Sequence, residues 1–312
     1  MPIYNGEKFL PASLGSIFAQ TFKDFEILLI NDGSTDASEK ICQSFVEQDL
    51  RARYFYKKNG GVSSARNLGL EKVLGKFIYF FDCDDIIAPD ALEFLVNLQK
   101  DTGADIVACA STNVFEQVIP AKFKKQNNDL ATIDTTVDKW DNVGIFTGVL
   151  RCKLFSRKVI SDVRFNEQIH YSEDNLFATE VFINAHKVSY SPAIKVFYYI
   201  HRESATHKVQ PYSFFQGFVL AKRLMKKKIY AATNNTKARE VFYRGYCISI
   251  VSLFRYVVHV ADKKEYELLQ KRYVKLLEEF IAKAELSMGK KLEYKTYIKS
   301  YKIARLIHVR KI

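Results

Sequence analysis

Short apolar runs alternate with amphipathic segments over the first 110 residues. The clearest run, 25–30, is nearly continuous and stops at a polar turn, as a strand buried on both faces does. Further strands are predicted at 53–56, 76–81 and 105–109. Helix patterns fill the intervals 34–48, 62–74 and 89–100. Strands that alternate with helices predict an α/β fold with a mostly parallel sheet and helices on both faces.

The pattern changes along the second half of the chain. A helix is predicted over 174–185, followed by one or two strands over 187–200, and the periodicity beyond Tyr212 is helical to the end. We therefore divide the chain into an α/β domain, 1–206, and a helical C-terminal region, 207–312. The α/β domain itself divides into halves, 1–110 and 111–206.

The net charge of +12 is unevenly distributed along the sequence. Residues 1–206 carry 23 Lys/Arg against 27 Asp/Glu, whereas residues 207–312 carry 24 against 8. A basic region of this kind suits an anionic partner such as nucleic acid, a membrane surface or a phosphorylated acceptor.

Cysteine usage and hydropathy indicate the compartment. The 5 cysteines are scattered without a CxxC pair, which favours neither a zinc site nor a disulfide framework and fits a reducing cytoplasm. The first residues lack the pattern of a signal peptide. The most apolar stretch, 246–260, is shorter than the roughly 20 residues that span a bilayer and is interrupted by Arg255, so we predict no transmembrane helix.

Three carboxylates, Asp82, Asp84 and Asp85, follow the predicted strand 76–81 without an intervening loop. They repel one another unless a cation or hydrogen bonds compensate. Hard oxygen ligands suit Mg²⁺ or Mn²⁺, which take one or two protein carboxylates plus phosphate oxygens and water. The alternative is a solvated acidic turn that caps the helix at 89–100.

Other polar residues stand at strand ends or helix starts, where ligand sites of open parallel sheets form. Asp32 could accept hydrogen bonds from a ribose or base, or simply form a turn. Arg66 could reach a phosphate, or lie on the surface. Asp174, next to Glu173, could act as a general base, or the pair could complement a helix dipole. Arg202 could contact a diphosphate, or belong to an ordinary loop.

Taken in order, these clusters resemble the inverting family 2 glycosyltransferases of the GT-A fold, particularly the bacterial polysaccharide enzymes. The matching segments are 2–7, 20–22, 31–36, 59–63, 65–67, 82–85, 153–155, 164–165 and 173–177, roughly the first two-thirds of the chain. The resemblance implies a GT-A-type, Rossmann-like sheet flanked by helices, here with a helical extension. In the family an apolar strand leads into the motif at Pro2–Asn5. We expect that strand to be absent here, which would expose sheet edges on both sides.

The resemblance also implies roles for individual residues. The nucleotide would be held by Pro2, Tyr4 and Asp32, with Arg66 near the donor phosphate or base. The DxD motif would be Asp82 and Asp84, with Asp84 the main ligand of Mn²⁺ or Mg²⁺ and Asp85 nearby. The catalytic base would be Asp174, with Glu173 orienting the acceptor and Arg202 assisting the diphosphate.

The implied reaction transfers a sugar, with inversion, from a nucleoside-diphosphate sugar to a hydroxyl of a saccharide or lipid-linked acceptor. We expect a UDP-sugar, bound by 1–110, an acceptor bound by 111–206, and a role in surface polysaccharide or capsule synthesis. The alternative is an inactive, membrane-peripheral scaffold or binding protein with the same fold. We expect no nucleic-acid partner. The region 207–312 either lies on an anionic membrane at the cytoplasmic face or packs and dimerises as ordinary helices.

Overall fold

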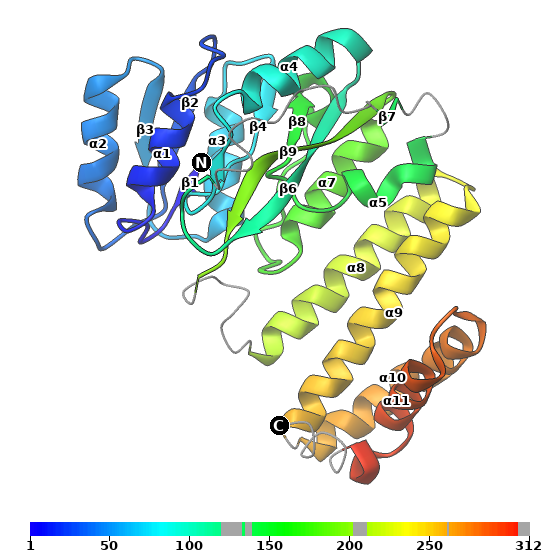
Figure 1. Ribbon diagram of the computed structural model, residues 1–312. Coiled ribbons are helices and arrows are strands. Elements are labelled where there is room, and N and C mark those ends of the chain that lie inside the picture. Colours follow the sequence, from blue (N-terminus) through cyan, green and yellow to red (C-terminus); the bar gives the residue numbers. More distant parts are fainter. Residues whose placement is uncertain (120–132, 135–138, 202–210, 261, 305–312) are drawn as a thin grey trace. The chain divides into compact units, whose positions relative to one another are not determined.

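The computed structural model describes residues 1–119, 133–134, 139–201, 211–260 and 262–304 (Figure 1). The chain divides into two compact units. The first comprises Met1–Glu167 and Glu173–Lys208, and the second Gln168–Ser172 and Val209–Ile312.

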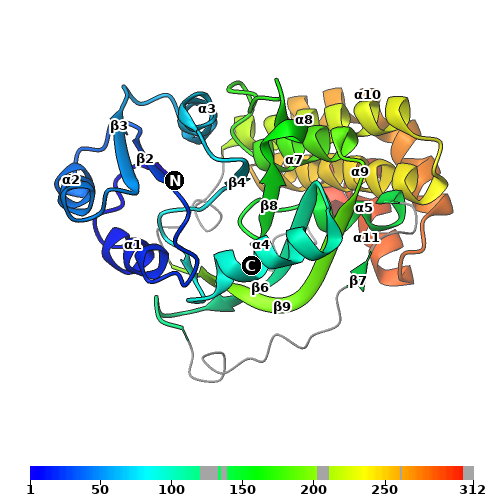
Figure 2. The ribbon, with the colours of Figure 1, turned by 90° about the horizontal axis from the view of Figure 1, so that it is seen from above.

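A three-stranded parallel sheet begins the first unit, in the order β1 (Pro2–Ile3), β2 (Ile27–Asn31), β3 (Ala52–Tyr56). The strands alternate with α1 (Leu10–Phe18), α2 (Ser38–Gln48) and α3 (Val62–Lys72). In β2, Ile27 and Leu29 belong to the core that includes α1 and α2, whereas Leu28 and Ile30 pack against Ala65 of α3. Figure 2 shows α1 and α3 on opposite sides of these strands. Burial of both faces explains why 25–30 is apolar almost throughout.

The first strand is only two residues long and lies at the edge of this sheet. Pro2 pairs with Ile30 and Ile3 with Asn31, and the α-amino group of Met1 donates to the carbonyl of Leu28 at 2.9 Å. Among the described residues, β1 has a strand partner on one side only.

The second sheet of this unit has six strands in the order β4-β8-β6-β9-β5, with β7 paired to β9. The strands are β4 (Phe77–Tyr79), β5 (Ile86–Ile87), β6 (Ile106–Val114), β7 (Ile133–Asp134), β8 (Lys153–Ser156) and β9 (Val188–Tyr199). The α/β class is confirmed, but only the β6–β9 pair is parallel here. Alternation of strands and helices along the chain predicts parallel pairing only where neighbouring strands are consecutive and joined by a helical crossover. Among the described strands of this sheet, no two paired strands are consecutive.

Aromatic packing fixes the start of α7 (Glu173–Asn184) beside the end of β4. The ring of Phe80 lies 5.3 Å from that of Phe177, and Phe165 stacks on Phe177 with centroids 4.0 Å apart. The other helices of the unit are α4 (Ala91–Thr102), α5 (Val143–Phe146), α6 (Arg157–Ile160) and the 3-10 turn Lys139–Asn142. The predicted helices at 62–74 and 174–185 are confirmed as α3 and α7 within two residues at each end.

The second unit consists of helices, as the periodicity beyond Tyr212 predicts. They are α8 (Tyr212–Ala232), α9 (Thr236–His259), α10 (Lys263–Lys283) and α11 (Met288–Lys299), packed around one apolar core. Among the described helices, α9 alone is long and apolar enough to cross a membrane by length and composition. Core helices of soluble proteins meet the same criteria, and 56% of its most apolar stretch is buried within the protein.

Candidate functional site

The carboxylate of Asp32, at the end of β2, holds the glycine turn that precedes α3. It accepts from Lys57 Nζ at 2.6 Å, from the Gly60 N–H at 2.9 Å and from the Gly61 N–H at 2.8 Å. Gly61 has φ +87°, which favours glycine. Since Asp32 is only 2% exposed, most of its acceptor capacity is used within the protein. The structure therefore gives Asp32 the turn-forming role, and its contact with a nucleotide stays a prediction.

The residues after β1 are tied to the same edge of the sheet. Asn5, with φ +49°, donates its N–H to Ser34 Oγ at 3.0 Å and accepts from the Thr35 N–H at 2.8 Å. Tyr4 is 55% exposed, so its ring is available to a ligand. Pro2 lies in β1 itself. The carboxyl ends of β1 and β2 therefore lie side by side at one edge of the sheet, as expected for two parallel strands, and Asn5 joins them by hydrogen bonds.

The acidic cluster after β4 does not act as a single group, because its carboxylates have different partners. Asp82 Oδ1 accepts from Arg66 Nη2 at 3.0 Å, and Asp84 Oδ2 lies 3.1 Å from His201 Nε2. Burial, followed by the negative charge of Asp82, raises the pKa of Asp84. The positive charge of a nearby cation would offset the effects of both burial and Asp82 and lower the pKa of Asp84.

Asp85 occupies a different environment from Asp84. Its side chain is fully buried, where Oδ1 accepts from the Tyr199 N–H at 3.2 Å and Oδ2 lies 3.8 Å from Arg151 Nε. Burial and the charges of Asp82 and Asp84 raise its pKa to about 8. These contacts make Asp85 a link between the acidic turn and β9. A metal ligand would have to leave them, so its predicted place near the metal stays a prediction.

Arg66 joins the acidic cluster to the start of α7. Its guanidinium donates from Nη2 to Asp82 and from Nη1 to Glu173 Oε1, both at 3.0 Å, although Glu173 lies 107 positions away in the sequence. Burial by itself would lower the pKa of Arg66. The negative charges of Asp82, Glu173 and Asp174 outweigh that effect and raise the pKa. Arg66 was predicted to approach a donor phosphate or base. In the structure it contacts two carboxylates of its own chain, and its approach to a donor stays a prediction.

Glu173 and Asp174 stand side by side in the first turn of α7. Burial and the charge of Asp174 raise the pKa of Glu173 against the opposing effect of Arg66. Asp174 Oδ1 accepts from the Asn175 N–H at 2.7 Å, so its carboxylate is held at the helix start, where it complements the helix dipole. Its role as the catalytic base stays a prediction. The predicted diphosphate contact, Arg202, lies outside the described residues.

Among the described residues, the oxygen and nitrogen donors nearest to a possible cation site are Asp84 Oδ2 and His201 Nε2, which lie 3.1 Å apart. The side chains of Asp82, Asp84 and His201 are 36%, 25% and 10% exposed. Within the described ranges, no group of three or more His, Cys, Asp or Glu side chains is arranged to hold a metal. The remaining ligands would therefore be phosphate oxygens and water, as is usual for Mg²⁺.

His201 has a more specific position than its sequence context indicates. Its ring lies 4.3 Å from that of Phe9 and 5.1 Å from that of Tyr199, and its Nδ1 is buried without a hydrogen-bond partner in the described structure. The sequence signal for His201 is its place two residues after the end of β9, because polar residues at strand ends often mark ligand sites.

Comparison with known proteins identifies the family. The model "Glycosyl transferase family 2" matches residues 1–164. The putative glycosyltransferase EpsH of Bacillus subtilis is 30% identical over 227 residues, which cover 70% of this chain and 64% of EpsH. The match to glycosyltransferase GlyA of Streptococcus pneumoniae covers only 15% of GlyA, so the chain spans less than two thirds of either relative.

Solved structures agree with this assignment at the level of the fold. S. aureus TarS 1-349 in complex with UDP-GlcNAc has a TM-score of 0.67 and 21% identity, with 99% of this chain and 89% of that chain covered. Mannosyltransferase PcManGT from Pyrobaculum calidifontis, in complex with GDP-Man and Mn²⁺, has a TM-score of 0.57 and 12% identity, with 99% and 84% covered. The family model matches more than half of the sequence, and the chain belongs to glycosyl transferase family 2.

Proposed function

We propose that this chain transfers a sugar, with inversion and with the help of a divalent metal, from a nucleoside-diphosphate sugar to an acceptor hydroxyl. The observation that carries the proposal is the pair of 3.0 Å hydrogen bonds by which Arg66 joins Asp82 to Glu173. They bring the carboxylates predicted for the donor beside those predicted for the acceptor. The UDP-GlcNAc complex of TarS supports a UDP-sugar donor.

The proposed chemistry is a single displacement. Asp174 takes the proton of the acceptor hydroxyl, whose oxygen attacks the anomeric carbon as the bond to the diphosphate oxygen breaks. Glu173, held by Arg66, orients the acceptor next to this base. A divalent cation, held by Asp84 and His201 when bound, would supply positive charge to the leaving diphosphate. The Mn²⁺ complex of PcManGT supports this choice of metal.

The proposed acceptor is a saccharide or lipid-linked saccharide of a bacterial surface polysaccharide or capsule, reached from the cytoplasmic face of the membrane. The basic character of the second unit supports this location. Arg223, Lys227 and Lys228 are exposed on α8, and residues 207–312 carry 24 Lys/Arg against 8 Asp/Glu. Each basic residue near an anionic surface adds about 1 kcal/mol to binding.

The test is release of nucleoside diphosphate from a panel of nucleotide-sugars by the purified chain, with Mn²⁺ and with chelator. Asp174→Asn should lower the rate by at least about 100-fold, the lower end for loss of a general base. The matched control is Asp162→Asn, an exposed carboxylate outside the site, which should leave the rate unchanged. A rate that chelator and Asp84→Ala leave intact contradicts the metal assignment. Absence of release from every donor, together with a cellular role that survives Asp174→Asn, favours the scaffold alternative.

A further inference from the structure

Two free cysteines face each other across the β6–β8 pair, although they are 43 positions apart in the sequence. Cys109 lies in β6, and Cys152 directly precedes β8. The antiparallel register places Ala108 opposite Lys153, so the next pair along is Cys109 and Cys152. The Cys109 N–H donates to the Cys152 carbonyl at 2.9 Å, which continues the ladder to this pair. Because the two residues are directly opposite, their side chains lie on the same face of the sheet.

The two thiols also interact with each other. Cys109 Sγ lies 3.6 Å from the Cys152 carbonyl oxygen, and the Cys109 thiol donates a hydrogen bond to the sulfur of Cys152. Opposite residues of an antiparallel pair that share a backbone hydrogen bond have Cα atoms about 5.5 Å apart, which is a common separation for the two halves of a disulfide. The reduced pair therefore already has the contact and the spacing that a disulfide needs.

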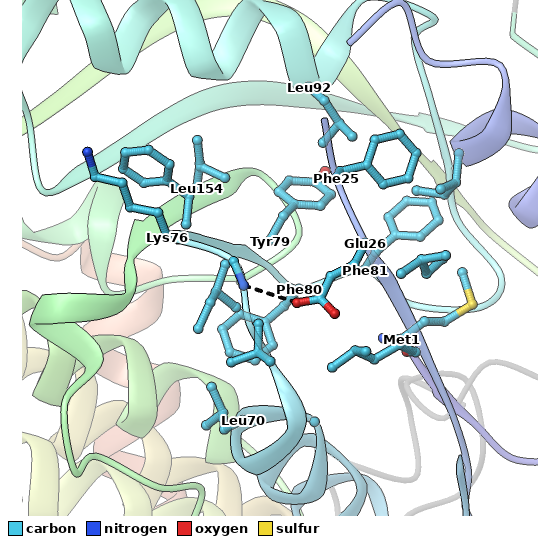
Figure 3. Close-up of a pocket in the computed structure, with 18 of the residues that line it drawn as sticks. Met1, Phe25, Glu26, Leu70, Lys76, Tyr79, Phe80, Phe81, Leu92 and Leu154 are labelled. Atoms are coloured by element: carbon cyan, nitrogen blue, oxygen red, sulfur yellow. Dashed lines mark hydrogen bonds between the residues drawn. The ribbon is translucent and has the colours of Figure 1, made fainter. Parts of the chain in front are cut away.

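The cysteine pair is buried in the apolar core of the first unit. Cys109 is 3% exposed and Cys152 is 5% exposed, and both belong to the core that includes Leu154. Leu154 pairs with Tyr79 of β4, and Figure 3 shows both residues at an apolar cavity of about 490 Å³. The Tyr79 hydroxyl donates to the carbonyl of Arg151, next to Cys152. Apolar surroundings of this kind admit a small, uncharged oxidant more readily than a charged one.

The environment of Cys152 differs from that of the buried cysteines outside the pair. The hydrogen bond from Cys109, together with the positive charge of Lys153, lowers the pKa of Cys152 against the effect of burial. Burial raises the pKa of Cys42 to about 12 and that of Cys247 to about 11. Since the thiolate is the nucleophile, Cys152 is the thiol of these that reacts first with an oxidant.

We propose that Cys109 and Cys152 are a redox-sensitive site, at which a peroxide forms a reversible disulfide in the folded chain. The Cys152 thiolate attacks one oxygen of hydrogen peroxide, the O–O bond breaks and hydroxide leaves, so that Cys152 becomes a sulfenic acid. The Cys109 sulfur then attacks the sulfur of Cys152, the S–S bond forms, the S–O bond breaks and a second hydroxide leaves. Each hydroxide takes up one thiol proton and becomes water. The two sulfurs supply the two electrons that reduce the peroxide.

The test treats the reduced full chain with increasing hydrogen peroxide, alkylates the remaining thiols and maps the cysteines by peptide mass spectrometry. We expect a peptide pair joined through Cys109 and Cys152, and recovery of both thiols with dithiothreitol. Cys152 should be consumed at least about tenfold faster than Cys42 or Cys247. The bond closes the chain between 109 and 152, so the midpoint of thermal unfolding should rise by at least about 5 °C. Neither measurement depends on glycosyl transfer.

Serine variants separate a specific disulfide from general oxidation. In Cys109→Ser, peroxide should leave Cys152 as a sulfenic acid that dimedone labels, and the midpoint should no longer rise. The matched control is Cys42→Ser, which removes a buried thiol of the same unit outside the pair and should still form the bond.

Mapping of the wild-type chain does not depend on the folding of any variant. Three results would overturn the proposal. The first is that Cys109 and Cys152 both remain alkylated at peroxide concentrations that oxidise Cys83, which is less buried. The second is that either forms its bond with another cysteine. The third is that the bond forms only in the urea-unfolded chain, or that the midpoint fails to rise when it forms.

Discussion

Replacing Arg66 by methionine tests whether one guanidinium holds the acidic turn and α7 together. The side chains of Arg66 and Glu173 are 8% and 11% exposed, whereas that of Asp82 is 36% exposed. Removing one partner of a buried ion pair costs about 3–5 kcal/mol, and an exposed pair contributes about 1 kcal/mol or less. Counting Asp82 as a surface partner, we expect Arg66→Met to lower the free energy of unfolding by about 3 kcal/mol, mainly through Glu173.

The assay is urea unfolding of Arg66→Met, Glu173→Gln and the double variant. The coupling energy between Arg66 and Glu173 should lie on the order of 1–3 kcal/mol. The matched control is Arg53→Met, because Arg53 is 36% exposed and donates to Glu26 at 2.7 Å; its loss should be about 1 kcal/mol or less. The reasoning is refuted if Arg66→Met costs no more than Arg53→Met, or if the coupling energy is near zero.

Three further predictions concern the metal, a buried lysine and the basic helix. His201→Gln should raise the Mn²⁺ concentration for half-maximal diphosphate release by about 10- to 100-fold. Burial lowers the pKa of Lys153 to about 8, so the folded state binds fewer protons than the unfolded state between pH 8 and 10.5. Stability should therefore rise with pH across that window, by on the order of 3 kcal/mol in urea unfolding, and Lys153→Met should abolish the rise. Arg223→Glu with Lys227→Glu should weaken sedimentation with anionic vesicles by at least about tenfold.

Two of these have a control that changes the same residue type elsewhere, and the third is compared with wild type. His186 is exposed, and His186→Gln should leave the Mn²⁺ dependence unchanged. The ammonium of Lys153 donates to the Val149 carbonyl, and the charged or titratable groups that act on it are those of Cys152, Asp174, Cys109 and Arg151. The comparison for this prediction is the difference in the free energy of unfolding between wild type and Lys153→Met at each pH. Lys158→Glu, on the first unit, should barely affect vesicle binding. A unit that binds neutral and anionic vesicles equally contradicts the membrane proposal.

The sequence predicted the parts of the site that depend on strand and helix ends. The run 25–30 and the turn after it became β2 and Asp32, and the start of α7 lies within one residue of its predicted position. Such features are local, because apolar runs and capping residues are read within a few positions of one another.

What the sequence could not provide is the partner of each polar side chain. Arg66 was assigned to a donor phosphate because guanidinium suits phosphate, but its partner Glu173 is brought to it by folding across 107 positions. Asp84 and Asp85 were predicted to share one metal, yet they are adjacent residues with different surroundings, His201 for one and the Tyr199 backbone for the other. No periodicity in the sequence reports which neighbour a turn residue will meet.

The hydrogen bonds of Arg66, Asp82 and Glu173 support the proposed metal more strongly than the three carboxylates at 82, 84 and 85 do by themselves. Asp82, Asp84, Glu173 and Asp174 bring negative charge to one region, and the guanidinium of Arg66 already uses Nη1 and Nη2 on two of them. A donor diphosphate would add further negative charge to a place where burial already raises the pKa of Asp84. In the proposed reaction, Arg66 could therefore balance the charge of a leaving diphosphate only in part. A divalent cation at Asp84 and His201 would balance the remainder without breaking the link between the acidic turn and α7.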